Sequence, residues 1–250
     1  MVLMGAKTRF IKDILPIILK NRGDKPYIET CGGGMNVISN VDGDRTAFEI
    51  NKYLVAMWKS LQSGIVFCEE ISREHYSDVR DCYNKKNGKY DDDYIGWVGF
   101  MASANGRFFE GGYAGISKTK DGERNYIAEK IRNIKNQIQK IKDVNFICAD
   151  FKEMTLDEES VIYCDPPYYG TKQYDKDNKD FDYPAYYKWC RHMVSLGHLV
   201  YMSEYQMPED FICIWEKETK SSLSANGKSG GNKKSTEKLF VHNSQLGLVT

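Results

Sequence analysis

The sequence predicts an α/β fold built around an open sheet, in which ligands bind at the carboxyl ends of the strands. Short apolar segments with strand character recur along the chain, and several run directly into an acidic or glycine-rich turn. Segments with helical spacing of apolar residues stand between them. The clearest strand, residues 161–164, is apolar without alternation, so we expect it to be buried on both faces.

Length and composition narrow the class of protein. The 250 residues are enough for one large domain or for one domain with a smaller insert. Lys plus Arg and Asp plus Glu both number 35, so a nucleic-acid surface would depend on local clusters of basic residues. The seven cysteines include no Cys-x-x-Cys pair, which favours a reducing cytosol over a disulfide framework or a structural zinc site. We expect a cytoplasmic protein with no signal peptide, membrane span or metal.

The N-terminal segment combines a helix, a strand and a glycine-rich loop. Apolar residues at helical spacing predict an amphipathic helix over 10–19. Lys7, just before it, could place an ammonium beside an anionic ligand group, and a solvated lysine is an equal alternative. A strand at 26–31 runs into three glycines at 32–34, which let the backbone approach a ligand closely. Their spacing is neither Gly-x-Gly-x-x-Gly nor a P-loop, and a turn without a ligand is an even alternative.

A second strand, at 45–50, carries an acid near its end. Asn51 follows as the predicted N-cap of a helix over 53–62. Glu49 lies about 20 residues past the glycine loop, where a carboxylate that holds a ribose is expected. The glycine loop and this acid together favour a cofactor that contains a nucleoside.

The character of the sequence changes between residues 64 and 142. Helices are predicted over 69–86 and 126–141, and between them residues 99–115 are rich in glycine and aromatic residues without a clear period. Basic residues interleaved with aromatic ones suit contact with phosphates and splayed bases. A small helical subdomain with a solvated loop is the equal alternative. The candidate DNA contacts here are Arg107, Lys118, Lys120 and Arg124.

The segment after the buried strand 161–164 suits one particular chemistry. An exocyclic amine on a nucleobase is a poor nucleophile because its lone pair is delocalised, so a catalyst must accept hydrogen bonds from it and hold it rigid. Asp165 supplies a carboxylate acceptor, and Pro166 and Pro167 end the strand and hold backbone carbonyls in place. Tyr168 offers a ring on which an extruded base can stack, a contact worth roughly 1–3 kcal/mol. A strand-to-loop turn with a solvated aromatic residue is the alternative.

Further strands are predicted on either side of this motif. The strand-then-acid pattern returns at 145–151, a helix is expected over 186–197, and another strand over 198–205. Two terminal strands are joined by a Gly/Ser/Lys loop that is nearly free of acids and could lie against a polyanion. Flexible solubilising loops share this composition. The candidate DNA contacts of this segment are Lys228, Lys233 and Lys234.

Taken in this order, the motifs resemble the Dam-type class of N6-adenine DNA methyltransferases, particularly short phage and prophage members, over most of the chain. Residues 165–168 match that family's catalytic motif in full. Residues 29–34 resemble its cofactor loop, from which Thr30 and Cys31 depart, and Met35 stands where a small residue is common.

The resemblance implies a Rossmann-like sheet dependent on S-adenosylmethionine, formed by residues 1–63 and 143–250, with an inserted, mainly helical target-recognition domain at 64–142. It implies S-adenosylmethionine as cofactor and double-stranded DNA as partner, and it leaves the oligomeric state open between monomer and weak dimer. The implied cofactor-binding residues are Leu3, Lys7, Glu29, Gly32, Gly33, Gly34, Glu49, Asn51, Asp150 and Asp165.

The mechanism that the resemblance implies begins with an adenine flipped out of the duplex, at a cost of roughly a few kcal/mol. Tyr168 stacks on the base, Asp165 and the Pro166 carbonyl accept hydrogen bonds from N6, and the amine attacks the sulfonium methyl in line. Two alternatives stay open: a catalytically decayed protein that only binds DNA, and a methyltransferase that acts on cytosine N4 or on RNA. The biological role, protection against restriction or regulation, is also open.

Overall fold

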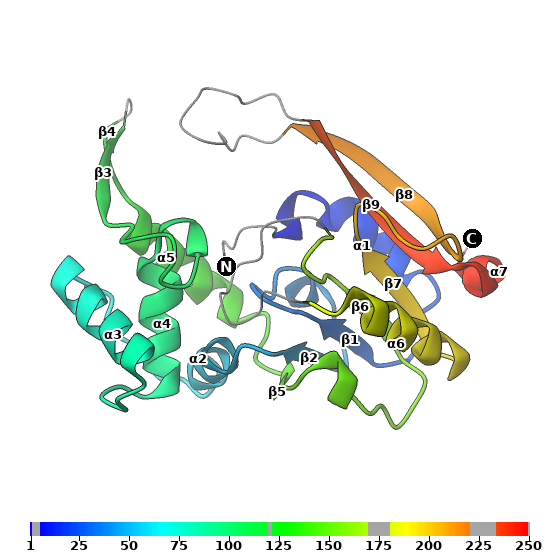
Figure 1. The fold of residues 1–250 in the computed structure, drawn as a ribbon, viewed down its shortest axis with the longest axis horizontal. Coiled ribbons are helices and arrows are strands. Elements are labelled where there is room, and N and C mark those ends of the chain that lie inside the picture. The colour runs from blue at the N-terminus through cyan, green and yellow to red at the C-terminus, as the bar shows by residue number, and fades with distance from the viewer. Residues whose placement is uncertain (2–5, 120–121, 170–180, 221–233, 250) are drawn as a thin grey trace.

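The centre of the molecule is a mainly parallel sheet (Figure 1). The structure is a computed structural model that describes residues 1, 6–119, 122–169, 181–220 and 234–249. Its sheet strands are β1 (Tyr27–Thr30), β2 (Arg45–Glu49), β5 (Asn145–Cys148), β6 (Val161–Cys164), β7 (Leu199–Ser203), β8 (Phe211–Lys220) and β9 (Lys234–His242). Within the described ranges these seven strands follow the order β5-β2-β1-β6-β7-β9-β8, in which β9 is antiparallel to β7 and β8 and the other pairs are parallel. The predicted α/β fold is confirmed.

The described residues form the helices α1 (Ile11–Leu19), α2 (Lys52–Gln62), α3 (Arg73–Lys85), α4 (Asp92–Ala102), α5 (Tyr126–Ile138), α6 (Tyr183–Ser195) and α7 (Leu246–Val249). Helices α4 and α7 were not predicted, and the other five agree with predicted segments to within a few residues. The helix predicted from residue 69 begins at 73, because the Ser72 side chain caps it by accepting a hydrogen bond from the His75 amide. The helix predicted from residue 186 begins at 183, after the cap Asp182.

One prediction of local structure is wrong. The segment 99–115 was expected to lack periodic structure, yet its first four residues belong to α4. Gly96 and Gly99 weaken the helical signal, but both lie where α4 contacts its neighbours closely. Tertiary contact therefore overrides the low helix propensity of glycine here.

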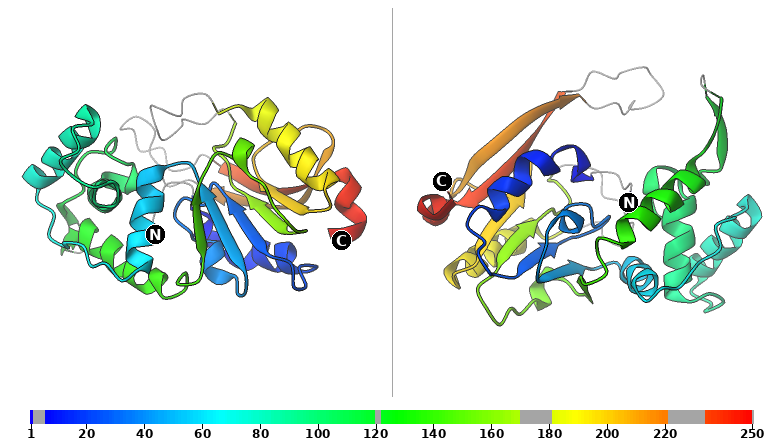
Figure 2. Two further views of the ribbon diagram at one scale, coloured as in Figure 1. Left: turned by 90° about the horizontal axis from the view of Figure 1, so that it is seen from below. Right: turned by 180° about the vertical axis from the view of Figure 1, so that it is seen from behind.

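Two hydrophobic layers cover the two faces of the sheet. Successive residues of β6 alternate between them: Val161 and Tyr163 enter one layer, whereas Ile162 and Cys164 enter the other. Helices α1 and α2 contribute to the first layer and α6 to the second, and Figure 2 shows α1 and α6 on opposite sides of the sheet. All four β6 residues are fully buried, which confirms the strand predicted to be covered on both faces.

The strand order reverses between β1 and β6, which are neighbours in the sheet. From β1 the chain proceeds to β2 on one side, and from β6 it proceeds to β7 on the other. The connections that leave these two strands therefore diverge and open a crevice at their carboxyl ends. The glycine loop follows β1 and the Asp165 motif follows β6, so both flank this crevice.

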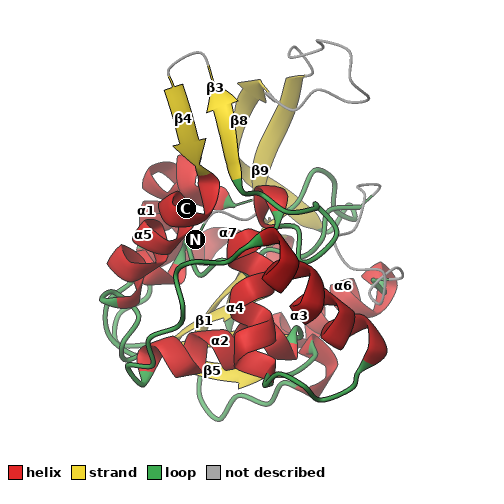
Figure 3. Ribbon diagram, turned by 90° about the vertical axis from the view of Figure 1, so that its left-hand side faces the viewer, coloured by secondary structure: helices red, strands yellow, loops and turns green. Residues whose placement is uncertain are grey.

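The segment between α2 and β5 lies beside the β5 edge of the sheet (Figures 1 and 2). It holds α3, α4, α5 and a hairpin of β3 (Ile116–Thr119) and β4 (Gly122–Asn125). Its buried residues Trp97 and Met101 share one hydrophobic cluster with Met57 and Trp58 of α2. The β3–β4 and β8–β9 hairpins project from the same side of the molecule (Figures 1 and 3). The division into two domains remains a prediction.

Candidate active site

A pocket of about 430 Å³ opens at the carboxyl ends of β1, β2 and β6. That volume falls within the roughly 300–1,000 Å³ of small-molecule sites. The described residues that the sequence singled out for cofactor binding or catalysis all line it: Lys7, Glu29, Gly32, Gly33, Gly34, Glu49, Asn51, Asp150, Asp165, Pro166, Pro167 and Tyr168. Leu3 lies outside the described residues.

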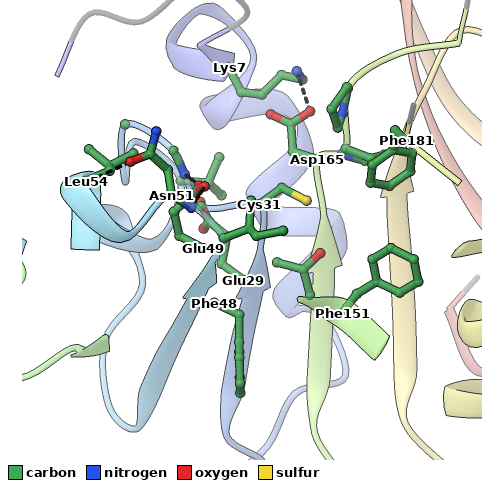
Figure 4. Close-up of a pocket in the computed structure, with 18 of the residues that line it drawn as sticks. Lys7, Glu29, Cys31, Phe48, Glu49, Asn51, Leu54, Phe151, Asp165 and Phe181 are labelled. Carbon is green, nitrogen blue, oxygen red and sulfur yellow. Dashed lines mark hydrogen bonds and ion pairs between the residues drawn. The ribbon is translucent and has the colours of Figure 1, made fainter. Parts of the chain in front are cut away.

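The glycine loop is tied to the end of β2 through Glu49. The Gly33 amide donates to one carboxylate oxygen of Glu49 at 2.9 Å, and the Asn51 amide donates to the other at 3.0 Å. Figure 4 shows Glu49 beside Asn51 on the wall of the pocket. Burial raises the pKa of Glu49, and the two amides oppose that rise by stabilising the ionised form. β1 and β2 are adjacent, so their carboxyl ends bring loop and acid together.

The loop itself has a tight conformation. Gly33 has a φ of 47°, and a Cβ atom on Gly34 would come within 2.6 Å of the Asn36 side-chain nitrogen. The flanking residues Cys31 and Met35 adopt left-handed conformations, with φ of 56° and 54°. Non-glycine residues seldom adopt this conformation, so two of the three departures from the family's loop pattern, Cys31 and Met35, coincide with backbone strain.

Lys7 meets Asp165 in the pocket. The Lys7 ammonium lies 2.6 Å from Asp165 Oδ1, and the two side chains are 5% and 21% exposed. The pair is drawn in Figure 4. Burial raises the pKa of Asp165 and the ammonium opposes this rise. Asp165 Oδ1 is buried and faces the Lys7 ammonium, and the two oxygens of a carboxylate offer about four acceptor sites, more than one ammonium contact occupies. The carboxylate therefore retains capacity to accept hydrogen bonds.

Tyr168 lies beneath the same ammonium. The Lys7 nitrogen is 4.6 Å from the centre of the Tyr168 ring, a cation–π contact, and the Tyr168 hydroxyl donates to Glu237 on β9. The Tyr205 ring meets the Tyr168 ring edge-on at 4.7 Å. The Tyr183 hydroxyl donates to the Pro167 carbonyl at 2.9 Å, which holds the second proline of the motif.

Glu29, on β1, is the other acid at the base of the pocket. It is 3% exposed, and burial raises its pKa to about 8. The Tyr27 hydroxyl donates to its carboxylate at 3.3 Å. The pocket thus contains several acids, whose ionised forms favour a cationic ligand group.

Sequence analysis missed several residues that line the pocket: Cys31, Phe48, Phe151, Phe181, Tyr205 and Glu237. Phe48 and Phe151 each adjoin a predicted acid, Glu49 or Asp150, so the same strand-end signal could have found them. Glu237 carries no comparable local signal, because the sheet brings it to the pocket from the end of the chain.

Those candidate DNA contacts whose side chains the structure describes lie outside the pocket lining. Lys118 and Arg124 are exposed on the β3–β4 hairpin, and the Arg124 guanidinium forms a two-bonded ion pair with Glu129 at 2.7 and 2.8 Å. Arg107 is partly buried. Lys120, Lys228 and Lys233 fall outside the described residues, and of Lys234 only the backbone is described. The DNA-binding role of all these residues remains a prediction.

Metal and membrane features are absent from the described part of the chain. Within it, no group of three or more His, Cys, Asp or Glu side chains is arranged to hold a metal ion. No helix among the described segments has the length and apolar character needed to cross a membrane.

Comparison with known proteins identifies relatives. A family model described as D12 class N6 adenine-specific DNA methyltransferase matches residues 4–219. The type II methyltransferase M.MjaIII of Methanocaldococcus jannaschii is 31% identical over 197 residues, which are 66% of this chain and 66% of that protein. Among solved structures, the rRNA methyltransferase AviRa of Streptomyces viridochromogenes aligns over 97% of this chain and 87% of its own, with a TM-score of 0.39 and 9% identity.

Proposed function

The chain belongs to the D12 class of N6 adenine-specific DNA methyltransferases, and from that premise we propose that it methylates N6 of adenine in double-stranded DNA. The methyl donor is S-adenosylmethionine. The observation that supports the proposal most directly is the Asp165 carboxylate, which lines the pocket beside Lys7 and Tyr168 and retains capacity to accept hydrogen bonds. An acceptor beside an aromatic ring suits an exocyclic amine on a stacked base.

The residues present fit S-adenosylmethionine. Glu49 would hold the ribose hydroxyls at the end of β2, and the tight loop at 32–34 lets the backbone approach the ligand closely. Phe48, Phe151 and Phe181 give an apolar wall for the adenine ring, with Asp150 beside them. The bound cofactor supplies an electrophilic methyl group on a sulfonium, and the acidic pocket suits its positive charge.

The chain's own residues orient the amine. Asp165 and the Pro166 carbonyl accept hydrogen bonds from N6 and direct its lone pair along the line of attack. Tyr168 holds the base by stacking. Lys7 favours the ionised form of Asp165 and so opposes the rise in its pKa that burial causes, because an ammonium at 2.6 Å stabilises the charged carboxylate. Catalysis therefore rests on orientation and charge placement, with no covalent bond between enzyme and base.

Asp165 lies in a recess of the pocket. Its carboxylate is 21% exposed, and the pocket is lined by the sheet edge and by Phe100, Gly106 and Phe108. A base that is paired and stacked in a duplex cannot reach such a group, so we propose that the enzyme flips the adenine out. The β3–β4 and β8–β9 hairpins, which project from one side, are the proposed arms that contact the DNA backbone.

The relative's type II designation suggests that this chain also takes part in restriction and modification. The chain matches 66% of that relative's length, so we extend the designation as a proposal. DNA in a bacterial or phage-infected cell lies in the cytoplasm, and we propose that location for the enzyme. The phage-like origin and the oligomeric state remain predictions.

Methyl transfer from labelled S-adenosylmethionine to unmodified bacterial DNA tests the proposal, with the product digested to nucleosides. We expect the label in N6-methyladenine and a loss of at least about 100-fold in Asp165→Ala, since the amine loses its main acceptor. Asp157→Ala is the matched control, because Asp157 is exposed and does not line the pocket.

Label in N4-methylcytosine, or in RNA but not in DNA, would reject the proposed substrate. Cofactor binding measured by calorimetry without any transfer would favour a protein that only binds DNA. Full activity in Asp165→Ala would remove Asp165 from the mechanism.

A further inference from the structure

Glu237 on β9 contacts two of the groups that the proposed reaction uses. Its carboxylate accepts a hydrogen bond from the Tyr168 hydroxyl and lies 3.7 Å from the Lys7 ammonium. We propose, on the basis of the proposed function, that Glu237 is a positioning residue for methyl transfer. Glu237 orients the Tyr168 ring, and it competes with Asp165 for the Lys7 ammonium.

The Tyr168 ring is held by contacts on three sides. Tyr168 is 8% exposed, and the hydrogen bond to Glu237 anchors its hydroxyl end. Tyr205 contacts the ring edge-on, and Lys7 lies over its face. A ring held at its hydroxyl, its edge and its face has little rotamer freedom left, so the stacking surface for the base is organised in advance.

Lys7 lies between two carboxylates. Its ammonium lies 2.6 Å from Asp165 and 3.7 Å from Glu237, so two carboxylates flank one cation. Burial raises the pKa of Glu237 and Lys7 opposes that rise. Without the negative charge of Glu237, Lys7 would pair with Asp165 alone. Its ammonium would then compete more strongly with the substrate amine for the Asp165 oxygens.

β9 holds Glu237 in a fixed position in the sheet. β9 pairs with β7 through Met202 with Phe240 and Ser203 with Leu239, and the Glu204 amide donates to the Lys238 carbonyl at 3.4 Å. Glu237 is the next residue along β9 and is 8% exposed. Its carboxylate therefore has a defined position relative to the sheet, as a positioning residue requires.

Two substitutions separate the two contacts. Glu237→Gln keeps an oxygen that can accept the Tyr168 hydroxyl but removes the charge that attracts Lys7. Glu237→Leu removes both. We expect kcat to fall by roughly 3–10-fold in the first variant and roughly 10–100-fold in the second, because a misplaced reacting group costs up to about 10²-fold. Glu158→Gln, a change at an exposed residue that lies outside both hairpins and does not line the pocket, should leave kcat unchanged.

The split between kinetic constants distinguishes positioning from a structural defect. We expect the Kd for S-adenosylmethionine and the melting temperature of Glu237→Gln to stay close to those of the wild type while kcat falls. Tyr168→Phe removes only the hydroxyl, so its effect in the Glu237→Leu background should be much smaller than in the wild type. Multiplicative effects of the two changes, or wild-type kcat in Glu237→Leu, would overturn the proposal.

A wild-type protein that transfers no methyl group to DNA would reject the proposed function. A second measurement tests the role of Glu237 even in that case, because it needs no methyl transfer. The protein is labelled with 3-fluorotyrosine, and the fluorine NMR signal of Tyr168 is assigned by its loss in Tyr168→Phe. We expect this signal to shift in Glu237→Leu and to stay in place in Glu158→Gln. An unchanged Tyr168 signal in Glu237→Leu would show that Glu237 does not hold the ring.

Discussion

At the scale of single residues, the pocket concentrates acids whose charge is costly to bury. Burial raises the pKa of Glu29 to about 8, and it also raises the pKa of Glu49, Asp165 and Glu237. Lys7 pairs with two of these acids and lies at 5% exposure among them. The excess of carboxylates suits a cationic cofactor, and in its absence it should cost stability.

Glu29→Gln should make this cost measurable. The pKa of Glu29 is about 8 in the folded protein, against 4.5 for a glutamate side chain free in water. Between these two pH values the folded state therefore binds one more proton than the unfolded state. Stability therefore falls as the pH rises from about 4.5 to 8, by on the order of a few kcal/mol. Glu29→Gln should lose this dependence and become more stable than the wild type near pH 8. Urea unfolding at several pH values, without cofactor, measures the difference.

The exposed Glu70→Gln provides the control and should follow the wild-type curve. The other buried acids are common to all three proteins, so only the difference between curves reports on Glu29. A difference between Glu29→Gln and the wild type that does not change with pH would contradict this prediction.

At the scale of elements, the approach of α4 to α2 depends on a glycine. A Cβ atom on Gly96 would lie 2.2 Å from the Tyr53 carbonyl oxygen and 3.1 Å from the Met57 Cβ atom. Trp97, next to Gly96, is 2% exposed in the core that the two helices share. The helices therefore pack at a separation that a larger residue cannot keep. This contact joins the segment between α2 and β5, called the inserted segment below, to the rest of the molecule.

Gly96→Ala should destabilise the protein by about 1–3 kcal/mol, because the helices must move apart or strain their backbones. Alanine's better helix propensity offsets only part of this cost, up to about 1 kcal/mol. The midpoint of urea unfolding measures the change. Gly247→Ala is the control: no atom lies within 4 Å of its new Cβ, and it should leave stability unchanged or slightly raised. Equal midpoints for the two variants would contradict the close packing.

At the scale of the whole molecule, the inserted segment supports the glycine loop. Gln137 on α5 donates hydrogen bonds to the Gly34 and Met35 carbonyls, both at 2.8 Å, across about 100 residues of chain. Phe100 and Phe108 of the inserted segment also line the pocket. The pocket is therefore formed by the inserted segment together with the sheet and its loops. The inserted segment thus has a structural role at the pocket, apart from any contact with DNA.

Gln137→Ala should weaken S-adenosylmethionine binding by about tenfold, because two buried carbonyls lose their donor at a cost of about 1–3 kcal/mol. Calorimetric titration of the cofactor measures this. Gln139→Ala, which changes an exposed residue at the end of the same helix, should bind as the wild type does. If both variants bound equally well, the glycine loop would not depend on α5.

Local patterns in the sequence were sufficient to predict much of the fold and several pocket residues. Apolar runs that end in acids or prolines mark β2 and β6, and Asn51 caps α2 by accepting the Leu54 amide at 3.0 Å, as predicted. These features depend on the backbone preferences of neighbouring residues. The resemblance to the family added the role of each motif. Boundaries shifted where a cap such as Ser72 outweighed the apolar period.

Only the tertiary structure decided which distant residues meet. Lys7 reaches Asp165 because the strand order reverses between β1 and β6, and Glu237 reaches Tyr168 because β9 pairs antiparallel with β7. Gln137 reaches the glycine loop through the packing of the inserted segment. No local propensity encodes these meetings, because each depends on sheet order and helix packing summed over the whole chain. The sequence by itself determined the strands, their terminal acids and the motif that follows β6, whereas the partners that orient those acids follow from the fold.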